Sequence, residues 1–153
     1  MKKEDGGTKK SKGVVGVWQV TEVRRQGAEG SMMTEPFPNL IIFTPRHYSM
    51  AWVMGAESDQ PFAERWKPTD EEKIKRFDSL VVNAGTYEID GAKLTAHPVV
   101  ARIADFIGGK LICEFNVDND VMRLEFVDEY SFDGVQAPWV ASGGLVLTLV
   151  RSG

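Results

Sequence analysis

The residue with the clearest potential for chemistry is His97, one of two histidines in the chain. It lies in the run 94–101, whose other members are apolar or small. Because an imidazole titrates near neutral pH, an inward-facing His97 could bind a ligand carbonyl or act as a general acid or base, with Tyr87 or Glu88 assisting. A purely structural histidine is the alternative. His47 lies at a predicted hairpin turn, where we expect it to be exposed.

A second group of residues could line an apolar binding site. Most of them alternate with polar or smaller residues along predicted strands, which puts them on one face of a sheet. Aromatic and thioether side chains suit apolar ligands because they offer a large, adaptable contact surface. Together with His97, the candidate ligand-binding residues are Tyr48, Met50, Trp52, Tyr87, Phe115, Met122 and Leu124. The same side chains could instead simply pack the core.

Several other kinds of site are disfavoured. Cys113 is the single cysteine, so no intrachain disulfide forms, and its apolar surroundings predict a buried side chain. Two histidines far apart with one distant cysteine make no zinc site, and Gly143-Gly144 precedes a strand rather than a helix, so we expect neither a metal nor a cofactor. The net charge of -4 and the pI near 5.2 argue against nucleic acid as a partner.

Short β-forming runs, separated by glycine, proline and aspartate, dominate the chain from residue 14 onward. Eight strands are predicted, at 14–25, 39–44, 47–54, 84–89, 93–101, 110–117, 121–127 and 144–151. Their short connections favour antiparallel neighbours in sequential order, and closure into a barrel removes the exposed edges of such a meander. The expected fold class is therefore all-β, an eight-stranded antiparallel up-and-down barrel.

One segment, residues 68–82, has helical periodicity instead. Thr69 followed by Glu72 is the pattern of a capping box. Three apolar residues then fall on one helical face: Ile74, Phe77 and Val81. We expect a short α-helix between the third and fourth strands. With the loop 55–67 before it, this helix could lie over one mouth of the barrel and gate a ligand.

The chain divides into a tail and one domain. Residues 1–13 are polar and lysine-rich, and they cannot bury enough apolar area to offset their ordering entropy, so we expect a flexible tail. Residues 14–153 suffice for a single barrel domain with its own core. No apolar run reaches the roughly 18 residues of a membrane span, and the first residues hold no signal-type stretch. As given, the sequence predicts a cytoplasmic protein, or an exported mature form if a signal peptide has been removed.

Three motifs together resemble the bacterial and fungal lipocalin-like domain family of the calycin superfamily. They are Gly16-Val17-Trp18, the segment 43–49, and the segment 84–91 followed by Leu94-Thr95-Ala96-His97, and the resemblance extends from Val15 to Arg151. It implies that Trp18 packs across the closed end of the barrel and that Arg151 stacks over it in a cation–π contact, with Gly16 in the same closure. The 55–82 insertion, the missing carboxy-terminal helix and the lack of a disulfide pair depart from a typical secreted lipocalin.

Three functions follow as hypotheses from this sequence. The first, which we favour, is binding of a small hydrophobic or amphipathic molecule inside the barrel, with access from the end opposite Trp18. The second is isomerase or cyclase chemistry in the same cavity, with His97 as the acid or base. The third is a protein-interaction module with a filled barrel that uses exposed aromatic residues, for which the candidates are Phe37, Phe62, Trp66 and Trp139.

Overall fold

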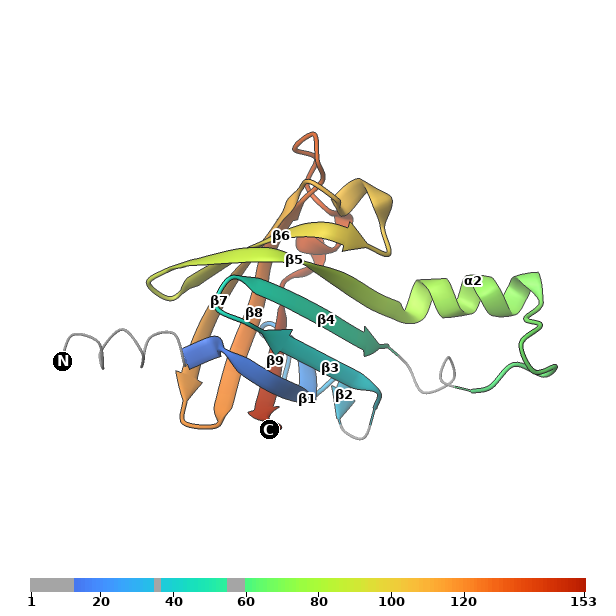
Figure 1. Ribbon diagram of the computed structural model, residues 1–153, viewed down its shortest axis with the longest axis horizontal. Coiled ribbons are helices and arrows are strands. Elements are labelled where there is room, and N and C mark those ends of the chain that lie inside the picture. The colour runs from blue at the N-terminus through green and yellow to red at the C-terminus, as the bar shows by residue number, and fades with distance from the viewer. Residues whose placement is uncertain (1–12, 35–36, 55–59) are drawn as a thin grey trace.

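The computed structural model describes residues 13–34, 37–54 and 60–153. In these ranges one antiparallel sheet curls into a barrel (Figure 1). The strands are β1 Gly16–Arg25, β2 Met33–Thr34, β3 Asn39–Phe43, β4 His47–Val53, β5 Leu80–Asp90, β6 Lys93–Ala101, β7 Lys110–Asp118, β8 Val121–Tyr130 and β9 Leu145–Arg151. One α-helix, α2 Asp70–Ser79, and two 3-10 helices, η2 Ala104–Phe106 and η3 Pro138–Ser142, complete the described elements. Apart from Gly13, the predicted flexible tail lies outside the described residues.

Strand β1 closes the barrel by pairing on both of its sides. Its first residues pair with β3, from Gly16 opposite Phe43 to Trp18 opposite Ile41. From Trp18 onward it also pairs with β9, across a β-bulge that lets the strand curve. The strands β3 to β9 follow in sequential order, each antiparallel to the next. The predicted closed, eight-stranded antiparallel barrel is therefore confirmed, and the two-residue strand β2 is an addition that pairs with Glu22 and Val23 of β1.

The helix forms where the capping box predicts it. The hydroxyl of Thr69 accepts the Glu72 N–H at 3.1 Å, and a Glu72 carboxylate oxygen accepts the Thr69 N–H at 2.8 Å. The helix ends earlier than predicted because the β-branched residues Val81 and Val82 pair with β4 at the start of β5. Its predicted place, between the third and fourth strands, is corrected: the unpredicted β2 precedes it, so it follows β4 and leads into β5.

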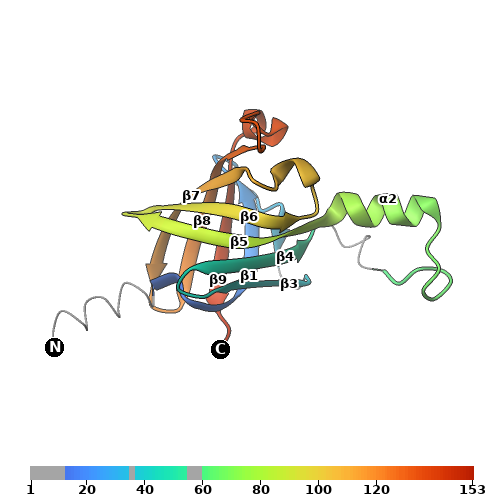
Figure 2. The same ribbon diagram turned by 45° about the horizontal axis from the view of Figure 1, so that its top comes forward.

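Helix α2 projects sideways from the barrel and leaves both barrel ends uncovered (Figures 1 and 2). Two of its apolar residues, Ile74 and Phe77, are 62% and 48% exposed. The expectation that this helix lies over a mouth of the barrel is therefore wrong. The loop that was expected to join it as a gate falls partly on 55–59, outside the described residues.

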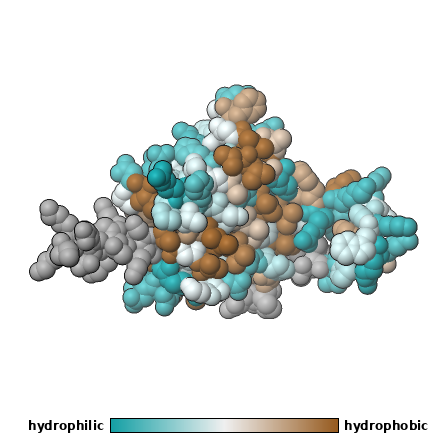
Figure 3. Space-filling view, viewed as in Figure 1, coloured by the Kyte–Doolittle hydropathy of each residue, from teal (hydrophilic) through white to brown (hydrophobic). Residues whose placement is uncertain are grey.

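The inward faces of the strands form one core. Its largest fully buried side chains include Trp18, Trp52, Met122, Leu124 and Leu147. Burying a side chain of this size contributes about 1.5–3 kcal/mol relative to leaving it in water, so this core is the main stabilising feature of the barrel. On the outside, apolar patches lie on the upper part of the barrel and lower on the same face, while the surface of α2 is largely hydrophilic (Figure 3).

Candidate ligand-binding cavity

One end of the barrel is closed by Trp18 and Arg151. The indole N–H of Trp18 donates a hydrogen bond to the carbonyl of Val14 at 2.8 Å, and the guanidinium carbon of Arg151 lies 4.3 Å from the centre of a Trp18 ring. Trp18 is fully buried, so this contact is largely removed from water. A cation over an indole face at this distance is attracted by the ring quadrupole.

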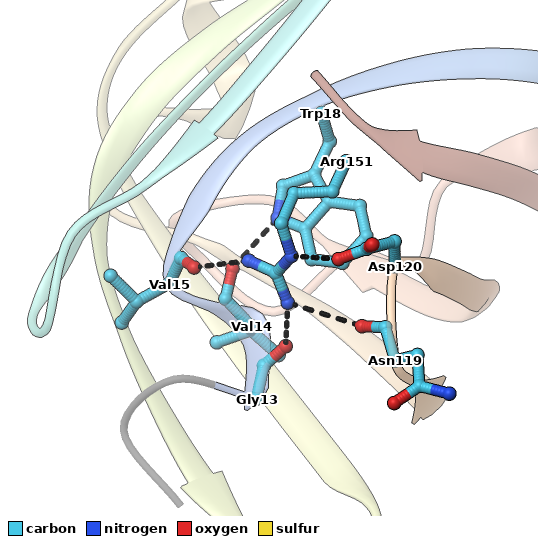
Figure 4. Close-up of polar contacts among 7 residues, drawn as sticks. All are labelled: Gly13, Val14, Val15, Trp18, Asn119, Asp120 and Arg151. Atoms are coloured by element: carbon cyan, nitrogen blue, oxygen red, sulfur yellow. Dashed lines mark hydrogen bonds and ion pairs between the residues drawn. The ribbon is translucent and has the colours of Figure 1, made fainter. Parts of the chain in front are cut away.

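The Arg151 side chain also ties three chain segments together (Figure 4). Its Nη1 donates to the carbonyl of Val15 at 2.7 Å, and its Nε donates to a carboxylate oxygen of Asp120 at 3.1 Å. Its Nη2 lies 3.4 Å from the carbonyl oxygens of Gly13 and Asn119. One side chain thus joins the residues before β1 to the turn between β7 and β8 across this end of the barrel.

Gly16 makes room for this closure. Its φ of +144° lies in a region that favours glycine, and a Cβ at this position would lie 2.7 Å from Nη1 of Arg151. Any side chain here would strain the backbone and displace the guanidinium. The three residues expected at the closed end, Gly16, Trp18 and Arg151, are therefore in mutual contact.

A cavity of about 250 Å³ lies at the opposite end of the barrel. Most of its wall is apolar, with Met50 and Trp52 from β4, Phe106 from η2, Leu111 from β7 and Phe126 from β8. An internal cavity of about 150 Å³ with apolar walls can take up benzene, so this one has room for a molecule of at least one substituted ring.

Asn83 brings a polar group into this apolar wall. It is buried on β5, and its Oδ1 accepts a hydrogen bond from the hydroxyl of Tyr48 at 2.5 Å. Burial raises the pKa of Tyr48, so the phenol keeps its proton and acts as the donor. The carbonyl oxygen of Asn83 is thereby engaged, which leaves the amide N–H2 group to bind an acceptor.

Glu129 places a carboxyl group on another side of the cavity. Its Oε1 accepts the indole N–H of Trp139 at 2.5 Å. Desolvation raises the pKa of Glu129 above its ordinary value, and the Trp139 hydrogen bond and the positive charge of Arg102 only partly offset that effect. A carboxyl group with a raised pKa in a cavity is typical of functional sites.

Two buried donors in the cavity wall have no hydrogen-bond partner within the described part of the chain: Nε1 of Trp52 and Nε of Arg102. The remainder of the Arg102 guanidinium is well held, because its Nη1 donates to the carbonyl of Phe77 and the group lies 4.9 Å from the centre of the Phe77 ring. Buried donors normally find a partner, so two in one cavity wall call for an explanation.

The predicted ligand-binding residues are distributed over three places. Met50 and Trp52 line the cavity, and Tyr48 supports it through Asn83. Met122 and Leu124 are fully buried in the core between the two ends. The remaining pair, Tyr87 and Phe115, lines a separate depression beside the closed end of the barrel.

His97 does not face the interior, contrary to the expectation for a catalytic or ligand-binding residue. The inward residues of β6 are Leu94, Ala96 and Pro98, so His97 points outward, and its side chain is 42% exposed. Its Nε2 lies 2.7 Å from a carboxylate oxygen of Glu88 on the outer face of the sheet. The prediction that His97 serves as an acid or base inside the barrel is therefore wrong.

Among the cavity residues that the sequence reasoning missed are Asn83, Arg102, Glu129 and Trp139. A signal existed for Asn83, which is a lone amide at an inward position of an apolar strand. The others come from the end of β8 and from the segments that follow β6 and precede β9. Only the closed barrel brings these segments to one mouth.

A closed antiparallel barrel, plugged at one end and hollow at the other, is a barrel of the lipocalin type. The chain belongs to the lipocalin-like domain family, because the family model for this domain matches residues 15–141. This confirms the resemblance drawn from the sequence motifs, and the fold suggests ligand binding in general. A comparison with curated proteins finds no match. Within the described ranges, no helix is long and apolar enough to cross a membrane.

Proposed function

We propose that the protein binds a small, mainly apolar molecule in the cavity at the open end of the barrel. The observation that carries this proposal is the cavity itself: about 250 Å³ with an apolar wall and buried polar groups set into it. Ligand sites are commonly of this kind, because apolar walls supply affinity and a few fixed polar groups supply orientation.

Access to the cavity is from the mouth beside β2 and η3. Met32, Met54 and Trp139 line the cavity here and are at least partly exposed. The other end is blocked by the Trp18 and Arg151 closure. A ligand that enters between flexible methionine side chains meets an adaptable surface, which suits ligands of somewhat different shapes.

Single-ring hydrocarbons test this proposal directly. Ethylbenzene titrated into the protein, followed by isothermal titration calorimetry and by ¹H–¹⁵N spectra, should bind saturably and shift the signals of cavity residues. Ala101→Phe should abolish binding because Ala101 lines the cavity and a phenyl ring would fill it. The matched control is Val100→Phe, at a neighbouring position that is 54% exposed. Binding that survives Ala101→Phe, or failure of the unmodified protein to bind any single-ring probe, would refute the proposal.

The structure bears differently on the other two hypotheses. The cavity weighs against the hypothesis of a filled barrel, and Trp139, one of the contact residues expected there, lines the cavity. His97 lies outside the cavity and is therefore no longer the candidate acid or base for isomerase chemistry. The carboxyl group of Glu129, which lies in the cavity wall, could take that role instead. In this second candidate function, Glu129 takes a proton from one carbon of the ligand and returns it to another, which moves a double bond without an oxidant. Glu129→Gln should then abolish isomerisation of a bound enone while leaving its affinity within about threefold.

A further inference from the structure

The unpartnered donors of the cavity belong to neighbouring positions of the sheet. Trp52 on β4 pairs with Val81 on β5, and Asn83 lies two residues further along β5 on the same inward face. Asn83 pairs in turn with Ala101 on β6, and Arg102 follows directly. Diagonal neighbours on adjacent strands are within reach of large side chains. Trp52, Asn83 and Arg102 all line the cavity, so their side chains are neighbours in its wall.

The groups on this side of the cavity are donors with no matching acceptor. An indole and a guanidinium can only donate, and the Asn83 carbonyl oxygen is already used by Tyr48. The acceptor in the wall, Glu129, comes from β8 and binds Trp139. A buried donor without an acceptor costs free energy, so an acceptor supplied from outside the cavity wall would stabilise this side.

We propose that the natural occupant presents a carbonyl-type oxygen, from a ketone, an amide or a carboxylate, to Nε1 of Trp52 and Nε of Arg102, with its apolar body against Phe106 and Leu111. This inference rests on the proposed function and narrows its ligand class. The amide of Asn83 supplies a further donor to the same oxygen or its neighbour. Hydrocarbons and protonated amines lack the acceptor that these donors need.

The fixed position of Arg102 makes this recognition selective. Its guanidinium is held by the Phe77 ring and carbonyl, so Nε cannot turn out to water without breaking those contacts. Hydrogen bonds from a charged donor are stronger than neutral ones. A carboxylate therefore gains most from Arg102, while a ketone gains mainly from Trp52 and Asn83, and the two ligand types can be told apart by experiment.

Three single-ring probes of similar size separate these cases: ethylbenzene, acetophenone and benzoate. We expect at least one of the two oxygen-bearing probes to bind about tenfold more tightly than ethylbenzene by calorimetry. Trp52→Phe should reduce that preference to about threefold or less, because it removes Nε1 and keeps an aromatic ring. Trp66→Phe is the matched control, since Trp66 is 94% exposed and lies outside the cavity wall.

A second measurement uses the unmodified protein and so does not depend on how a variant folds. The indole N–H signal of Trp52 should move downfield when acetophenone or benzoate binds, and should not when ethylbenzene binds. If benzoate binds more tightly than acetophenone, the natural ligand carries a carboxylate. If acetophenone binds more tightly, the natural ligand carries a neutral carbonyl group. Equal affinity of all three probes, or an unmoved Trp52 signal, overturns this inference and leaves the proposed function intact. If none of the three binds, the proposed function fails as well.

Discussion

The substitution Gly16→Ala tests the closure of the barrel most sharply. Gly16 has a φ of +144°, and an added Cβ would lie 2.7 Å from Nη1 of Arg151. Backbone strain of this kind costs about 1–3 kcal/mol, and loss of the cation–π contact with Trp18 costs about 0.5–2 kcal/mol. We therefore expect Gly16→Ala to lower the free energy of unfolding by about 3 kcal/mol, which for a domain of this size lowers Tm by about 6–12 °C.

The assay is thermal and urea unfolding followed by far-ultraviolet circular dichroism, with Gly30→Ala as the matched control. A Cβ at Gly30 would meet no atom within 4 Å, so this control should change stability by no more than about 0.5 kcal/mol. Below its Tm, Gly16→Ala should still bind the probes of the open-end cavity. Equal Tm values for the two variants would refute the steric argument. Loss of probe binding in a folded Gly16→Ala protein would show that the binding site does not lie at the open end, where we propose it.

Four further predictions concern the cavity, its surroundings and the helix. Tyr48→Phe should lower the free energy of unfolding by about 1–3 kcal/mol in urea titrations, because it leaves the buried Asn83 oxygen without its donor. Burial raises the pKa of Glu129, so the folded state binds the carboxyl proton of Glu129 more tightly than the unfolded state does. Protonation of Glu129 therefore stabilises the folded state below the unfolded-state pKa, and this stabilisation is lost as pH rises through the folded-state pKa. Unfolding measured from pH 4 to 8 should therefore show Glu129→Gln gaining stability over the unmodified protein as pH rises, and a constant difference would contradict the raised pKa. His97→Ala should change neither probe affinity nor stability by more than about 0.5 kcal/mol, because its contact with Glu88 is an exposed ion pair. Thr69→Ala should weaken α2 by about 1 kcal/mol, seen as faster amide exchange in the helix, without altering probe affinity.

The barrel could be predicted because its signals are local. Turn residues such as Asp90-Gly91 and Asp118-Asn119-Asp120 separate the strands, and alternation within β8 sorts Met122, Leu124 and Phe126 to the inside. The capping box at Thr69 likewise depends on residues three apart. In each case the physical cause lies within a few residues, so one sequence is enough.

The cavity could not be predicted because its causes are not local. The residues around His97 are small or apolar on both faces of β6, so alternation did not show which face is inside. Arg102 and Glu129 belong to segments far apart in the sequence, and only the pairing of β5 through β8 brings them to one mouth. The contacts of Phe77 on α2 with Arg102 likewise join residues 25 positions apart, so no local pattern shows them.

The two most deeply buried tryptophans differ in how their indole N–H groups are satisfied. Trp18 and Trp52 are both no more than 1% exposed. The indole N–H of Trp18 binds the Val14 carbonyl, and that of the less buried Trp139 binds Glu129, so this barrel can satisfy an indole where packing is the only need. Trp52 alone among these three has an unpartnered N–H, and it lines the cavity. A phenylalanine would avoid that cost, which supports the proposal that a ligand acceptor completes this N–H.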